Sequence, residues 1–481
     1  MSTGITIRRR DFCKTTLIGG ALALLPVGLR SFGAEPSVVS AAAAKDLAGR
    51  LRGRLITSAD PDYDQARRIW NRSFNRRPAL IAQCAGAADV TRCIEFARER
   101  ELLVAVRGGG HSFAGYSTCD GGLVIDLSPM RGVRVDPFAK TARVAGGAWN
   151  RDLDWEAQQY GLATPMGRVG NTGVGGLTLG GGYGRLSRLY GLACDNVLAA
   201  DLISADGKLL RISAAENPDL LWALRGGGGN FGVVTSFEYR LHPVGPEVLA
   251  GYLTYEPTQM RAVLEQYAQV CARAPRELAL DLAMHTDATG ARRPLMLFCF
   301  IGDPNKGRKL LDAIHTATKP VTDDVRPRDY RQLQGAQDGP ALSDTAEYAK
   351  TAHVPSVTPQ LIEALLQEHA VDIALSLSGG AVADIDPGGS AVAHRREPFL
   401  MEISTEWQDL SQSEAKRAQL HGVWDRLVPF TRGFYGNLTV ADQKAVDDNY
   451  GANITRLMRI KRRYDPGNFF RLNANIRPAL L

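Results

Sequence analysis

A single histidine, His111, stands directly after three consecutive glycines in the run Arg107-Gly108-Gly109-Gly110-His111-Ser112. The apolar residues 102–106 before this run are typical of a buried β-strand, so the glycines begin where the strand ends. Because glycine has no side chain, backbone N–H groups can approach a phosphate closely there. The run therefore predicts a loop that holds a phosphate-bearing cofactor and presents one imidazole to it. A glycine turn followed by a purely structural histidine is the alternative.

A denser glycine segment lies further on, at residues 170–184. So many glycines cost conformational entropy on folding, which is tolerable where the backbone must wrap closely around a large ligand. A flexible linker is the alternative, but it fits poorly because Val174, Leu177 and Leu179 interrupt the glycines. The segment therefore favours a second stretch of cofactor-binding backbone.

A third cluster, Gly227-x-Gly229-x-x-Gly232, formally matches a dinucleotide-binding fingerprint. That fingerprint requires a strand before the glycines and a helix after them. Here residues 220–224 have a helical pattern and residues 233–241 a strand pattern, which is the reverse order. The cluster therefore does not predict a nicotinamide-type site.

The chain has 481 residues, which is long enough for two or three packed units. The elements that must position the glycine loops are predicted to be both helices and strands. A hairpin is predicted for residues 133–135 and 141–144, and Asp206-Gly207 predicts a type I′ turn. After Gly245 the pattern changes to strands with helices between them, at residues 278–284, 295–301, 372–377 and 399–407. This pattern predicts an α+β protein whose second domain has an antiparallel sheet covered by helices on one face.

The first 34 residues have the features of an export signal. Arg9-Arg10 with Phe12 and Lys14 precede the uncharged residues 15–29, which are too few to span a bilayer comfortably. The pattern predicts a twin-arginine signal read by the Tat export machinery, and a periplasmic or secreted protein with no stable membrane span after cleavage. A basic start to a membrane anchor is the alternative. Cleavage lowers the formal net charge from +6 to +2, so nucleic acid is not an expected partner.

Cysteines and histidines do not form a metal-binding pattern. Six cysteines remain after the signal, with no CxxC, and the eight histidines include no HExxH, so no metal site is predicted. The apolar residues around Cys299 suggest that several cysteines are simply buried.

Together these motifs resemble those of the berberine-bridge-enzyme-like FAD-linked oxidoreductases, which belong to the vanillyl-alcohol-oxidase type with a PCMH-type FAD-binding domain. The resemblance rests on four motifs in register, at residues 107–112, 173–196, 223–232 and 450–468. It implies an entry segment (35–75), a two-subdomain FAD-binding domain (76–245), a substrate domain with an antiparallel sheet (246–432) and a C-terminal return to the FAD domain (433–481).

The resemblance also implies FAD as the cofactor, joined to His111 through the flavin 8α-methyl group. Many members carry a second link through a cysteine, but Val169 occupies that position here, so a single link is expected. The residues implied in cofactor binding are His111, Arg107, Gly108, Gly109, Gly110, Ser112, Gly173, Val174, Gly175, Gly176, Gly180, Gly181, Gly182 and Asn453.

The implied catalytic residues are Tyr183, Glu402 and Tyr435. Oxidation of an alcohol needs a group that removes the hydroxyl proton as hydride leaves carbon for flavin N5. Similar proteins use a tyrosine after the triple glycine, which is Tyr183, helped by an acidic or amide residue at the position of Glu402. Tyr435 resembles the first tyrosine of a Tyr-x-Asn-Tyr segment. Leu438 replaces the second, and Phe113 also replaces a tyrosine that many relatives have.

The expected function is oxidation of a hydroxyl-bearing carbon in a small molecule, a sugar or secondary metabolite, with dioxygen as acceptor and hydrogen peroxide as product. A dehydrogenase of the same fold that uses a quinone or cytochrome is one alternative. Thr172 lies at a position that influences oxygen access in relatives, but this residue does not distinguish an oxidase from a dehydrogenase. A flavin-binding protein without catalysis is the other alternative.

Overall fold

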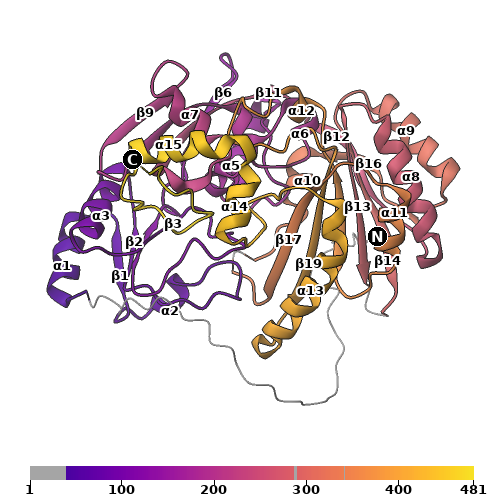
Figure 1. The fold of residues 1–481 in the computed structure, drawn as a ribbon. Helices are drawn as coiled ribbons and strands as arrows, with labels where there is room; N and C mark the ends of the chain where they lie inside the picture. The colour runs from indigo at the N-terminus through magenta and orange to yellow at the C-terminus, as the bar shows by residue number, and fades with distance from the viewer. Residues whose placement is uncertain (1–38, 287–289, 341, 481) are drawn as a thin grey trace, which may run out of the picture.

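The computed structural model describes residues 39–286, 290–340 and 342–480, so the predicted signal peptide lies outside the described residues. Three larger sheets and the helices around them form a mixed α+β fold (Figure 1). The predicted α+β class is confirmed, including the antiparallel sheet with helices on one face. In the described ranges no helix is both long enough and apolar enough to cross a membrane.

The first sheet positions the loop that carries His111. Its strands, in the order β1-β2-β4-β3, are β1 (Arg54–Thr57), β2 (Leu80–Gln83), β4 (Leu123–Asp126) and β3 (Val104–Arg107). Helices α1 (Ala41–Arg50) and α3 (Ala87–Glu99) pack against it through Leu47, Val90 and Ile94. Strand β3 runs parallel to β4 and ends at Arg107, so the glycines leave the sheet at its carboxyl edge.

The second sheet is antiparallel and supports the glycine segment. Its order is β5 (Val133–Asp136), β6 (Thr141–Ala145), β10 (Val233–Arg240), β8 (Val197–Ile203) and β9 (Leu209–Ser213). Next to it lie α4 (Asn150–Ala157), α5 (Val174–Leu179), α6 (Ser187–Tyr190) and α7 (Pro218–Leu224). A backbone bridge between Trp149 and Gly173 joins the segment to the start of α4. Helix α7 before the third glycine cluster and β10 after it confirm the order predicted from the sequence.

The predicted type I′ turn at Asp206-Gly207 is wrong. That turn needs positive φ at both residues, and only Gly207 has it, with φ 82°. The hairpin of β8 and β9 is closed instead by a longer loop, in which the Ser204 amide donates to the carbonyl of Lys208 at 3.0 Å. The Ser204 hydroxyl also donates to the Asp206 carboxylate, and this local hydrogen bond stabilises the longer loop.

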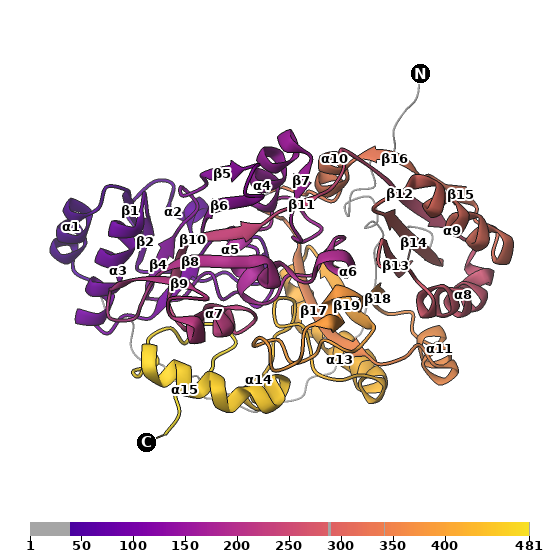
Figure 2. The ribbon, with the colours of Figure 1, turned by 90° about the horizontal axis from the view of Figure 1, so that it is seen from above.

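The third sheet forms one wall of the large cavity. Its path is β15 (Thr322–Asp323), β12 (Glu247–Thr254), β14 (Arg292–Phe300), β13 (Leu278–Thr286), β18 (Asp372–Leu377), β19 (Phe399–Trp407) and β17 (Ala346–Val354), and β16 (Arg326–Asp329) also pairs with β12. One face packs on α8 (Met260–Ala272), α9 (Pro304–Ala317), α11 (Pro359–Leu366) and α13 (Ser413–Leu427). Figure 2 shows α8, α9 and α11 on the side of this sheet away from the first two sheets.

The alternation of side chains along β19 separates the two faces of this sheet. Met401 and Ile403 belong to the apolar core under the helices, whereas Leu400, Glu402 and Ser404 face a cavity. This period of two is what a strand with one face on a core requires.

The C-terminal segment returns to the second sheet, where α14 (Gln443–Tyr450) and α15 (Ile454–Tyr464) lie beside α7 (Figure 1). It is fixed by the fully buried Lys461, whose ammonium pairs with Asp465 at 2.6 Å and donates to the carbonyls of Asn230 and Phe470. The remaining elements are α2 (Tyr63–Ala66), α10 (Tyr330–Gly335), α12 (Ala381–Asp384), β7 (Leu162–Ala163) and β11 (His242–Pro243).

Candidate functional site

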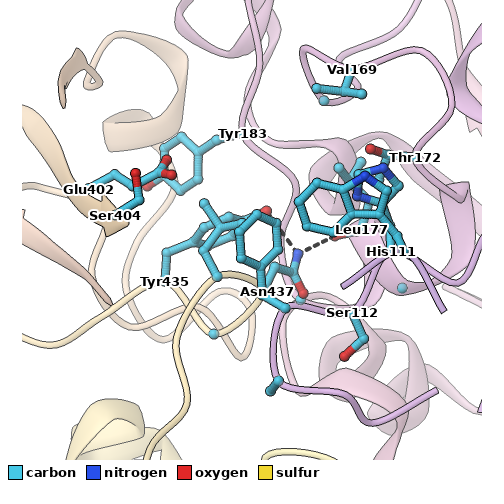
Figure 3. A pocket seen from close by; sticks show the side chains of 18 of the residues that line it. His111, Ser112, Val169, Thr172, Leu177, Tyr183, Glu402, Ser404, Tyr435 and Asn437 are labelled. Carbon is cyan, nitrogen blue, oxygen red and sulfur yellow. Dashed lines mark hydrogen bonds between the residues drawn. The ribbon is translucent and has the colours of Figure 1, made fainter. Parts of the chain in front are cut away.

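A cavity of about 1500 Å³ lies between the glycine loops and the open face of the third sheet. This volume exceeds the roughly 300–1,000 Å³ of an ordinary small-molecule pocket, so it can hold a large cofactor and a substrate together. Predicted site residues that line it are Gly108, Gly109, Gly110, His111, Ser112, Gly173, Gly175, Gly176, Gly180, Tyr183, Glu402 and Tyr435. In Figure 3 His111 and Thr172 lie on one side, and Tyr183, Glu402 and Ser404 lie on the other.

The glycines of the two loops are required by the close approach of their backbones. A Cβ atom on Gly109 would lie 2.4 Å from the amide nitrogen of Gly173, and one on Gly173 would lie 2.3 Å from that of Gly109. Real Cβ atoms do not come this close, so a side chain at either position would push the loops apart. The paired backbones form a cradle with no side chains of its own beside the cavity, which fits the phosphate-bearing part of FAD.

His111 is held from two sides. The indole of Trp70 stacks on its imidazole, with ring centroids 4.5 Å apart and 16° between the planes. Its Nε2 is 3.2 Å from Oδ1 of Asn171, a residue of the second glycine segment. The loop of the first sheet therefore presents a fixed imidazole to the cavity.

Tyr183 and Tyr435 meet at the opposite end of the cavity, edge to face, with ring centroids 5.2 Å apart. The Tyr183 hydroxyl is fully buried and makes no hydrogen bond within 3.5 Å among the described residues, although the Ser378 hydroxyl is near enough to lower its pKa slightly. Burial raises the pKa of Tyr183 above its ordinary value, so its phenol is neutral at physiological pH. The Tyr435 hydroxyl accepts a hydrogen bond from Nδ2 of Asn437 at 2.8 Å, and the same amide also donates to the carbonyl of Leu177 (Figure 3).

Glu402 brings a carboxylate to this end of the cavity. It lies on β19 opposite Thr351 of β17 and faces the cavity together with Ser404. It makes no hydrogen bond or ion pair with the residues that the structure describes. Ser376 of the neighbouring strand β18 adds a hydroxyl that accepts from Arg168 at 3.2 Å. The wall opposite the glycine loops is thus polar, and the Glu402 carboxylate faces the cavity from it.

Five residues predicted to bind the cofactor lie outside the cavity lining. The Arg107 guanidinium points to the other face of β3, where it donates to the carbonyl of Ala66. Val174 is packed in the core under the second sheet. The carbonyls of Gly181 and Gly182 accept the amides of residues 194 and 193, and the Asn453 amide donates to the carbonyls of residues 387 and 390. These residues support the backbone around the cavity without lining it.

Several lining residues escaped the sequence analysis. Trp70 and Asn171 hold His111, but each lies far from it in the sequence. Asn437, the amide of the Tyr-x-Asn segment that begins at Tyr435, was given no role of its own, although it holds Tyr435. His353 is buried near Tyr183, where burial and His394 lower its pKa to about 3, so its imidazole is neutral. Gly226, Gly228, Gly229 and Gly232 of the third cluster also line the cavity. The repeated glycines of this cluster are the sequence signal from which these four residues could have been predicted to line the cavity.

A buried ion pair joins the loop after Tyr183 to the segment before β19. The Arg395 guanidinium contacts both oxygens of Asp195, at 2.7 and 3.0 Å, and both side chains are almost fully buried. The same carboxylate accepts the amide of Leu192, which lines the cavity. The six cysteines within the described ranges are all buried with free thiols.

Comparisons with known proteins agree with this geometry. Residues 78–213 match the family model described as "FAD binding domain", and residues 434–477 match "Berberine and berberine like". An FAD-linked oxidoreductase of Dictyostelium discoideum is 30% identical over 442 residues, 89% of this chain and 95% of that protein. The (R)-6-hydroxynicotine oxidase of Paenarthrobacter nicotinovorans is 30% identical over 446 residues, 89% of this chain and 97% of that protein.

A solved structure shares the fold over nearly its whole length. The crystal structure of 6-hydroxy-D-nicotine oxidase from Arthrobacter nicotinovorans superposes with a TM-score of 0.82 at 28% identity, covering 89% of this chain and 98% of that one. The glycine cradle, the matched domains and relatives of this length agree on the cofactor and on the enzyme class. The chain therefore belongs to the berberine-bridge-like FAD-linked oxidoreductases and is an FAD-binding enzyme.

Proposed function

We propose that the enzyme oxidises a hydroxyl-bearing carbon of a sugar or secondary metabolite and passes the electrons to dioxygen, giving hydrogen peroxide. The observation that carries the proposal is the meeting of Tyr183, Tyr435 and Glu402 at the end of the glycine-lined cavity. It places one carboxylate and two phenols around a space that is open to a substrate. A hydroxyl group needs such neighbours to be oriented and to lose its proton.

The backbones of residues 108–112 and 173–180 would hold FAD, with His111 joined covalently to it and no second link at Val169. When bound, FAD supplies the acceptor for the hydride that leaves the substrate carbon. The stacked and hydrogen-bonded imidazole of His111 supports this proposal because a fixed ring loses little freedom on attachment.

Glu402 is the acceptor of the hydroxyl proton in this proposal. Burial keeps Tyr183 a neutral phenol, so it serves better as a hydrogen-bond donor to the substrate oxygen than as a base. Tyr435, already bound to Asn437, narrows the space beside it and fixes the direction of approach. The apolar Leu177, Leu192 and Leu400 around these groups limit the access of water.

The test is a screen of sugars and phenolic alcohols for loss of the visible flavin absorbance without oxygen. A substrate found in this way is then oxidised in air, and peroxide is measured against reduction of a dye. Stoichiometric peroxide is expected. Rapid dye reduction with no peroxide in air would instead identify a dehydrogenase that uses another acceptor.

Export through the twin-arginine route is also part of the proposal. Its support is the basic pair Arg9-Arg10 before the apolar residues 15–29. A protein that binds a large cofactor between distant segments must fold around it, and this route is generally used by proteins that fold before they cross the membrane.

A further inference from the structure

Asn171 is a polar side chain that the structure places against the ring of His111. It is 3% exposed, and its Oδ1 is 3.2 Å from Nε2 of the histidine. Its Nδ2 donates to the carbonyl of Gly339 at 2.8 Å, and its backbone amide lies 3.3 Å from a carboxylate oxygen of Asp338. The side-chain amide is thus held on both sides, by His111 and by the loop around residue 338.

This arrangement fixes which way the amide points. Gly339 offers a carbonyl, which only accepts, so the NH₂ group of Asn171 must face it and the oxygen must face His111. An amide oxygen also only accepts, so Nε2 of His111 must carry a proton. A neutral imidazole has a single N–H, and its lone pair is then on Nδ1.

We propose that Asn171 is a positioning residue for the attachment of FAD: it holds His111 with the proton on Nε2 and makes Nδ1 the nitrogen that bonds to the flavin. The inference rests on the covalent link proposed above. In that step one N–C bond forms to the 8α carbon and one C–H bond of that carbon breaks. The proton of that C–H bond passes to solvent and its two electrons would remain on the flavin as reduced cofactor, which dioxygen reoxidises while being reduced to hydrogen peroxide.

The oxygen of Asn171 also matters after the bond has formed. Attachment through Nδ1 leaves a substituted imidazole that still carries the Nε2 proton and therefore a positive charge. The Asn171 oxygen accepts that charged N–H, which is a stronger hydrogen bond than the one made by the neutral ring. The contact consequently favours the attached state as well as the required tautomer.

The experiment measures covalent attachment rather than turnover. Wild type, Asn171→Leu and Asn171→Asp are purified and incubated with excess FAD, and flavin is measured in the acid-precipitated pellet and in the supernatant over time. Asn150→Ala is the matched control, because the Asn150 amide holds the same loop through the carbonyl of Val169 at 3.0 Å without touching His111.

Asn171→Leu is expected to slow the gain of pellet flavin about 10- to 100-fold, by analogy with the cost of losing a group that orients a metal-binding histidine. Asn171→Asp keeps an acceptor and is expected to stay within about threefold of wild type. Fragmentation of the flavin-bearing wild-type peptide should place the bond on Nδ1.

Three outcomes would overturn the inference. They are wild-type attachment in Asn171→Leu, equal loss in Asn150→Ala, or FAD that is bound but not attached in Asn171→Asp. The absence of pellet flavin from FAD-loaded wild type is a different result, because it refutes the covalent link itself.

Discussion

Tyr183 and Tyr435 meet edge to face with ring centroids 5.2 Å apart, yet only one of the two hydroxyls is bonded to the protein. The Tyr435 hydroxyl accepts from Asn437, whereas the Tyr183 hydroxyl is buried with no partner among the described residues. A buried hydroxyl without a partner is costly, and a ligand that supplies the missing bond would remove that cost. The pair therefore combines one phenol whose hydroxyl is fixed by Asn437 with one whose hydroxyl makes no hydrogen bond of ordinary length to the described protein.

Tyr183→Phe is expected to reduce the rate of flavin reduction by a substrate about 100-fold, because it removes a donor aimed at the reacting oxygen. The melting temperature should not fall, since the lost hydroxyl bonds nothing in the described protein. Stopped-flow absorbance without oxygen and thermal melting measure the two effects. Tyr160→Phe, at an exposed tyrosine, is the control. An unchanged reduction rate in Tyr183→Phe with a substrate of wild type would contradict the proposed role.

His111→Ala is expected to abolish flavin in the acid-precipitated pellet while the protein still binds some FAD through its glycine loops. The covalent bond is lost, but the cradle of Gly109 and Gly173 is untouched. Pellet and supernatant absorbance after acid treatment give the two amounts. A coloured pellet from this variant would show that another residue carries the flavin.

Asp154 makes stability depend on pH. Burial raises its pKa to about 7 from an ordinary value of 3.8. Between these values the folded protein holds a proton that the unfolded chain has released, so the free energy of unfolding falls as pH rises from 4 to 7. Asp154→Asn removes this loss and should stabilise the protein at pH 8, by about 4 kcal/mol at most, with little change at pH 4.

Urea unfolding of wild type and Asp154→Asn at both pH values measures the difference. The Asn can still accept from Gln334, whose Nε2 is 3.5 Å from the carboxylate, so the substitution preserves this contact. An equal change in stability at pH 4 and pH 8 would show that the proton on Asp154 is not the cause.

Two neighbouring arginines offer a comparison between a buried and an exposed ion pair. Arg395→Met leaves Asp195 charged and buried without its partner, and should cost about 3–5 kcal/mol of unfolding free energy. Arg396→Met breaks a 4.0 Å contact between exposed side chains and should cost less than about 1 kcal/mol. Urea unfolding followed by tryptophan fluorescence measures both. Similar values for the two variants would contradict the assignment of Arg395 as the anchor of this loop.

Replacement of Arg9-Arg10 by Lys-Lys should retain the protein in the cytoplasm, because the twin-arginine machinery reads the guanidinium pair. Cell fractionation followed by immunoblotting measures the distribution. The control replaces Arg8 by Lys and should be exported normally. Continued export of the double variant would argue against this route.

Local patterns predicted the elements well because their causes are local. The hairpin of β5 and β6 and the covered face of β19 follow from the alternation of apolar and polar residues. The same alternation along β3 predicts which face of the strand carries the Arg107 side chain. Val104 and Val106 line the cavity, so Arg107, one step further along β3, points to the opposite face. The resemblance implies a cofactor role for the whole motif from Arg107 to Ser112, and it does not distinguish the residue that faces away from the cavity.

Contacts between distant segments could not be predicted in this way. The bond from Asn171 to His111 spans 60 residues and depends on how the two glycine loops meet. Nothing in the residues around Asn171 marks it as a partner of a histidine. The resemblance to a family could not reveal it either, because the motifs quoted for that resemblance do not include Asn171.

The wall of the cavity extends from Trp70 to Ala474, so the first and last parts of the chain both contribute to it. A chain that is still being translated has the first glycine loop and the histidine but lacks Tyr435 and the segment anchored by Lys461. The binding space is therefore complete only after the segment through residue 474 has been made, so the cofactor can be enclosed only after that point in synthesis.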